Sequence, residues 1–65
     1  MTPTDLLELI HKHHITSVAL CRIFSLDQRH NTTAGKIVLG LVRKKCCMRH
    51  AAVAIKHEAA RGNGT

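Results

Sequence analysis

Positively charged side chains fill the second half of the sequence, and their natural chemistry is the binding of phosphate groups. The stretch from Gln28 to His57 contains no aspartate or glutamate. Such a one-sided charge attracts polyanions, and nucleic acid is the commonest polyanion that a small basic protein meets. A solvated basic surface without a specific ligand is the other interpretation. The stretch carries seven cations: Arg29, Lys36, Arg43, Lys44, Lys45, Arg49 and Lys56.

The cysteines and histidines are the next residues whose chemistry must be weighed. Cys46, Cys47 and His50, with Cys21 or His57 in addition, contain the ligand types that zinc prefers. A structural zinc site usually has two separated pairs of ligands, whereas this spacing gives one crowded half. The sequence therefore predicts no metal site and cysteines that behave as small apolar residues. An odd number of cysteines also fits a reducing cytoplasm better than a disulfide framework.

Catalytic chemistry is not expected from this chain, and neither is a cofactor. Its only acids are Asp5, Glu8, Asp27 and Glu58, which show no pairing suited to acid–base catalysis. Gly35 and Gly40 sit within an apolar periodic segment rather than in a phosphate-binding loop. We therefore predict a protein that is not an enzyme.

Two helices are predicted in the first half of the chain. Thr2 and Pro3 are typical of a helix start, and the apolar residues that follow recur at helical spacing as far as His13. Thr16 and Ser17 give a second start signal, with helical periodicity up to Ser25. The polar residues 26–31 predict a connector.

The segment from Thr33 to Lys44 is predicted to be a helix with two chemically different sides. Apolar residues form one arc, and polar and basic residues form a stripe on the opposite side. A strand remains the alternative, because several of the apolar residues are β-branched. The arc contains Ala34, Ile37, Val38, Leu41 and Val42, and the stripe contains Thr33, Lys36, Gly40, Arg43 and Lys44.

The last part of the chain fits two structures. Apolar residues at helical spacing from Met48 to Ala59, with Gly62 as a stop, favour a fourth helix. Val53, Ile55 and His57 also alternate with other residues, so residues 46–57 could instead form a short β-hairpin. The hairpin would lack the usual turn residues, and alanine is abundant, so the helix is preferred.

Sixty-five residues with an apolar content of 45% predict a single small folded domain over residues 1–61 and a flexible tail at 62–65. The longest apolar run, 37–42, is too short to cross a bilayer. We therefore expect a cytoplasmic protein that does not bind membranes. Phe24 is the only aromatic residue, which disfavours binding of single strands through stacked bases.

The order of these elements resembles the three-helix core of helix-turn-helix and winged-helix DNA-binding domains. The resemblance covers residues 15–45, about half of the chain: one short helix, a connector and the basic helix. The connector is longer than in the tight helix-turn-helix, which favours the winged type, whose wing would have to come from residues 46–57. The chain is then a mainly α domain of three or four helices, similar in size and charge to the small regulators of phages.

This resemblance implies a role for each candidate residue. Thr33 and Lys36, at the start of the basic helix, would reach base edges or phosphates in the major groove of double-stranded DNA. The start of the preceding helix could donate hydrogen bonds to a phosphate. Positioning contacts to phosphates are expected from Arg29, Arg43, Lys44, Lys45 and Arg49, and the helix-start donors are Thr16 and Ser17.

Two questions about partners stay open at this level. A domain with so small a DNA-contacting surface would bind weakly alone, so a homodimer on a two-part site is the expected form. The alternative function is a helical adaptor or inhibitor whose basic side docks on an acidic protein. High salt and competing duplex would separate these two classes, since DNA binding is strongly salt-dependent.

Overall fold

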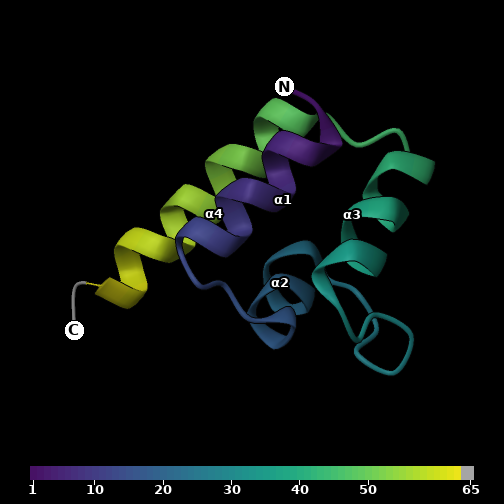
Figure 1. Ribbon diagram of the computed structural model, residues 1–65. Coiled ribbons are helices and arrows are strands. Elements are labelled where there is room, and N and C mark those ends of the chain that lie inside the picture. Colours follow the sequence, from purple (N-terminus) through teal and green to yellow (C-terminus); the bar gives the residue numbers. More distant parts are fainter. Residues whose placement is uncertain (64–65) are drawn as a thin grey trace.

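A computed structural model describes residues 1–63, which form four α-helices (Figure 1). The helices are α1 (Pro3–Lys12), α2 (Ser17–Phe24), α3 (Ala34–Arg43) and α4 (Met48–Asn63). No strand occurs among these residues, so the prediction of a mainly helical fold is confirmed. Of the predicted tail, residues 62 and 63 continue α4, and residues 64 and 65 lie outside the described residues.

Threonine caps begin the first three helices: Thr2 and Thr16 are the predicted helix starts, and Thr33 is the residue at which the third predicted helix begins. The Thr2 hydroxyl accepts a hydrogen bond from the Asp5 N–H at 3.2 Å, and the Asp5 carboxylate accepts one from the Thr2 N–H at 3.0 Å. This capping box lowers the pKa of Asp5, chiefly through the bond from the Thr2 backbone. Thr16 and Thr33 cap α2 and α3 in the same way, each through a backbone N–H three residues further on.

The hairpin alternative for residues 46–57 is wrong, because α4 covers the chain from Met48 onward. In a strand, Val53 and Ile55 would lie on the same face. In the structure Ile55 is fully buried, whereas Val53 is 52% exposed. Ala51, Ile55 and Ala59 are instead buried together at intervals of four, which is the spacing of a helix. The chain therefore has no wing within the described residues.

The four helices pack so that α1 and α2 each contact both α3 and α4. Helices α1 and α4 run side by side in the same direction, and α3 returns the chain from the α2 end to the start of α4 (Figure 1). Helices α3 and α4 do not pack against each other.

Every helix contributes a fully buried aliphatic side chain to one core. Such burial of apolar surface is the main force that holds a domain of this size together. No side-chain nitrogen or oxygen within the described residues is buried without a hydrogen-bond partner. The largest fully buried side chains are Leu6, Ile10, Leu20, Ile37 and Ile55.

Candidate nucleic-acid interface

Helix α3 presents a mixed basic and apolar side to solvent. Its inner side is held by Ile37, Val38 and Leu41, all buried against the other helices. The predicted polar stripe lies at the surface, where Gly40 alone is half-buried. Val42 departs from the prediction, because it was placed in the buried arc and is 41% exposed. The solvent side of α3 therefore carries Gly35, Lys36, Leu39, Val42 and Arg43.

The first turn of α3 gathers Lys36 with two threonines. The Thr33 hydroxyl oxygen accepts the Lys36 N–H at 3.2 Å, so it serves the helix cap while its hydrogen stays available to donate to a ligand. The Lys36 ammonium lies 3.4 Å from the Thr32 hydroxyl. These three exposed residues form a cluster of hydrogen-bond donors at the positive end of the helix dipole.

Four exposed cations surround the turn that joins α3 to α4. They are Arg43, Lys44, Lys45 and Arg49, and we call them the basic turn. No ion pair within residues 1–63 involves any of them, or Lys36. The chain folds sharply here, with Lys45 in the left-handed conformation at φ 57°. Their charges are therefore available to an anionic partner.

Arg29 differs from the other predicted phosphate contacts, because a carboxylate already holds it. Its backbone N–H donates to Asp27 at 2.9 Å, and its guanidinium forms an ion pair with the same side chain at 3.3 Å. The backbone hydrogen bond from Arg29 is the main cause that lowers the pKa of Asp27. His30 lies 3.8 Å from the same carboxylate. Asp27, which immediately precedes the acid-free stretch, thus pairs with Arg29, the first cation of that stretch.

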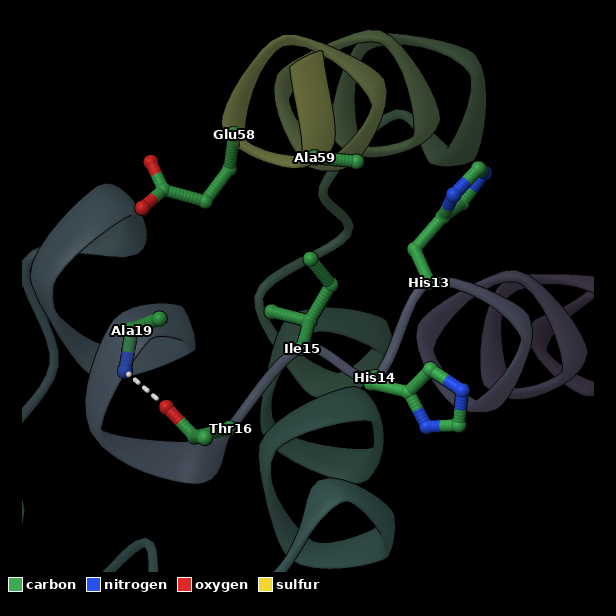
Figure 2. A pocket seen from close by; sticks show the side chains of 7 residues that line it. All are labelled: His13, His14, Ile15, Thr16, Ala19, Glu58 and Ala59. Carbon is green, nitrogen blue, oxygen red and sulfur yellow. Dashed lines mark hydrogen bonds between the residues drawn. The ribbon is translucent and has the colours of Figure 1, made fainter. Parts of the chain in front are cut away.

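Thr16 and Ser17 lie at a different place, beside a small cleft between the end of α1, the start of α2 and α4. The cleft has a volume of about 350 Å³, and Figure 2 shows Thr16 and Glu58 among the side chains around it. Thr16 caps α2 through the Ala19 N–H at 3.1 Å, and Ser17 is half-buried. Glu58, on the α4 side of the cleft, forms an ion pair with Arg22 that joins α2 to α4.

A second basic surface, on α4, was not recognised in the sequence. Lys56 belongs to the run of cations but is not among the predicted DNA contacts. At helical spacing Arg49, Val53 and Lys56 share one side of α4, and all are exposed. His50, His57 and Arg61 are also exposed on the same helix. Arg49 belongs both to the basic turn and to this side of α4, and Lys56 lies seven residues, about 10 Å along the helix, beyond it, so the run of cations extends from the basic turn along α4.

The cysteines are spread over three environments. Cys21 is buried, Cys46 is half-buried and Cys47 is exposed immediately before α4. Hydrogen bonds from the backbone N–H groups of His50 and Arg49, in that order, lower the pKa of the Cys47 thiol. Within residues 1–63, no three histidine, cysteine, aspartate or glutamate side chains come together as metal ligands would.

Comparisons with known proteins found no match, whether to a family model, a curated protein or a solved structure. The resemblance to helix-turn-helix domains therefore stays a prediction based on the residues of this chain. Among the described helices, none combines the length and the apolar character that crossing a bilayer requires.

Proposed function

We propose that this chain binds double-stranded DNA through the solvent side of α3 and the basic turn, and that it acts as a small sequence-specific regulator. The observation that carries the proposal is the set of exposed cations at both ends of one helix, without carboxylate partners in the described part of the chain. Cations in such a position contact phosphates and release the counterions condensed on DNA.

The dimensions of α3 support this function. An α-helix with its side chains is about 10–12 Å wide, and the major groove is about 12 Å wide. Lys36 and Arg43 are seven residues apart, which is close to two turns and about 10 Å along the helix. With α3 in the groove, Lys36 and Thr33 would approach base edges and the basic turn would contact the phosphate backbone.

The packing of α2 against α3 supports the helix-turn-helix interpretation. In that motif the first helix crosses the DNA backbone and braces the second, which enters the groove. Here α2 contacts α3 across the connector formed by residues 25–33. The proposal gives Arg29, Thr16 and Ser17 minor roles at most, because carboxylates lie beside Arg29 and Thr16.

A homodimer on a two-part site is part of the same proposal. One helix of ten residues makes few base contacts, and doubling them through a second copy is the usual way to reach useful affinity. The solvent sides of α3 and α4 are both basic, so a symmetric contact through either would bring like charges together. A dimer is therefore expected to use another surface.

The test compares Lys44→Ala with Lys56→Ala in a salt series on a labelled duplex. Both changes remove one exposed lysine from the same run of cations, but only Lys44 belongs to the basic turn. Wild type should lose affinity with a log–log salt slope between about −3 and −5, and Lys44→Ala should reduce that slope by about 0.9. Lys56→Ala should leave the slope unchanged. Equal effects of the two variants would overturn the assigned surface.

Lys36→Ala extends the test to sequence preference. On a duplex selected from a random pool, it should weaken binding more than on an unselected duplex, whereas Lys44→Ala should weaken both alike. If neither change alters affinity, the proposed interface is wrong. Failure of the wild type to bind any duplex at low salt would favour the alternative function, docking of the basic side on an acidic protein.

A further inference from the structure

Leu39 and Val42 are apolar side chains exposed in the middle of the proposed DNA-contacting side of α3. They are 50% and 41% exposed, whereas the next apolar residues of the helix, Val38 and Leu41, are buried. Gly35, Leu39 and Val42 recur at intervals of four and three, so they form one line along the helix. Lys36 and Arg43 lie along the same side.

Neither packing in the core nor a protein interface explains why this exposed line of residues is apolar. No other element covers it within the described residues, since α3 packs through its opposite side. Two half-exposed side chains expose far less than the ~800 Å² that each partner buries in a standard protein interface. Cations at both ends of the helix also match a phosphate backbone better than an apolar partner.

The major groove offers a small apolar target of the right kind. Each thymine presents its C5-methyl group there, and apolar side chains that contact this methyl help to distinguish T·A from the other base pairs. The distance of about 10 Å between Lys36 and Arg43 along the helix corresponds to about three base-pair steps of 3.4 Å. Leu39 lies between them along the helix, so it would face the central base pairs if α3 lay in the groove.

Glycine at position 35 would allow a ligand to approach the solvent side of α3 closely. A Cβ atom built at Gly35 would meet only the Thr33 hydroxyl, at 3.9 Å, so packing within the chain does not require glycine. Glycine within a helix is destabilising relative to alanine. A missing side chain at the exposed first turn leaves room for a backbone or base edge of a ligand.

We propose that Leu39 and Val42 determine specificity by contacting thymine methyl groups, so that the preferred half-site contains thymine at its centre. This inference rests on the proposed DNA-binding function. It assigns sequence discrimination to two apolar residues, whereas the basic turn supplies affinity for phosphates.

The test uses the duplex most enriched from a random pool, synthesised once with thymine and once with deoxyuridine at every thymine position. Deoxyuridine lacks only the C5-methyl group. Wild type should bind the deoxyuridine duplex roughly fourfold more weakly for each methyl that is contacted. The double variant Leu39→Ala, Val42→Ala should bind the two duplexes equally. Val53→Ala, which shortens a similarly exposed valine on α4, is the control and should behave as wild type.

The outcomes separate this inference from the function on which it rests. Salt-sensitive binding that ignores the thymine methyl groups, or a selected motif without thymine, would overturn the inference and leave DNA binding in place. No binding to any duplex at low salt would overturn both. Circular dichroism should show that the variants fold, because the changes are at exposed positions.

Discussion

At the residue scale, three helices end in the same unusual way. His14, Ser25 and Lys45 adopt the left-handed conformation, with φ of 54°, 55° and 57°. The following residue, Ile15, Leu26 or Cys46, turns back to the core, and its N–H bonds to a carbonyl five positions earlier. This is the pattern of a Schellman motif, in which glycine is the preferred left-handed residue. The chain thus accepts some backbone strain at each end.

Ser25→Gly tests this strain. Glycine adopts the left-handed conformation without a Cβ clash, so the free energy of unfolding should rise by up to about 1 kcal/mol. Thermal unfolding measures the change. Ser25→Ala is the matched control, because alanine keeps the Cβ and should give no stabilisation. A lower melting temperature for Ser25→Gly would contradict this account of the turn.

The Cys47 thiol gives a prediction about pH. Because its pKa is lowered in the folded state, the thiolate forms at a lower pH than in the unfolded chain. Iodoacetamide should alkylate Cys47 before Cys46 and the buried Cys21. The rate of Cys47 alkylation should rise at a lower pH in the folded protein than in the protein unfolded by urea. The same shift stabilises the fold above the unfolded thiol pKa, and this contribution is lost as pH falls through the folded pKa. Identical pH profiles in folded and unfolded protein would refute the shift.

At the element scale, α3 must form a stable helix although it contains two glycines. Its inner side packs in the core, but Gly35 and Gly40 weaken it as a helix. A Cβ atom at Gly40 would meet only the Asn31 side chain, at 3.9 Å, which is an ordinary contact. Gly40 therefore has no packing role that alanine could not fill.

Gly40→Ala should consequently stabilise the protein by about 0.5–1 kcal/mol. For a domain of this length, such a gain raises the melting temperature by several degrees. Differential scanning calorimetry checks the value. Destabilisation would show that α3 approaches the Asn31 loop more closely than the structure indicates.

The sequence was sufficient to predict α1 and α2 and favoured a helix over a strand for α3, because threonine caps and helical periodicity are local signals. It left α4 open, since Val53 and Ile55 suit a strand as well as a helix until the burial of Ile55 is known. The left-handed residues were not foreseen, because none is glycine or asparagine. The ion pair between Arg29 and Asp27 was not predicted, because Asp27 lies immediately before the acid-free stretch that begins at Gln28.

The division of the cations between α3 and α4 could not be predicted from their order along the chain. Lys44 and Lys56 belong to one continuous run in sequence. How the helices are placed is a tertiary property, and in the structure Lys56 lies on α4 more than two helical turns beyond the turn that holds Lys44. For the same reason, no local sequence pattern predicts that Thr16 and Glu58 line the same cleft.

At the scale of the whole molecule, one small core must hold four short helices. The radius of gyration is 10.8 Å, close to the ~11 Å expected for a folded chain of this length. Few residues are fully buried, so each has a large share of a stability that is modest in small domains.

Ile55→Ala should therefore destabilise the protein severely. Removing a fully buried isoleucine costs about 2–5 kcal/mol, which approaches the total stability of so small a domain. Val53→Ala, at a half-exposed position of the same helix, should change stability by less than about 1 kcal/mol. Urea titration followed by circular dichroism compares the two. Similar losses would contradict the assigned register of α4.

The central claim is that the basic side of α3 binds duplex DNA with sequence preference. The most direct measurement is retention of a labelled random duplex pool by the purified protein across a salt series, followed by sequencing of the retained fraction. The account predicts an enriched motif and steep loss of binding as salt rises. Retention without a motif would contradict sequence specificity, and no retention at low salt would contradict DNA binding itself.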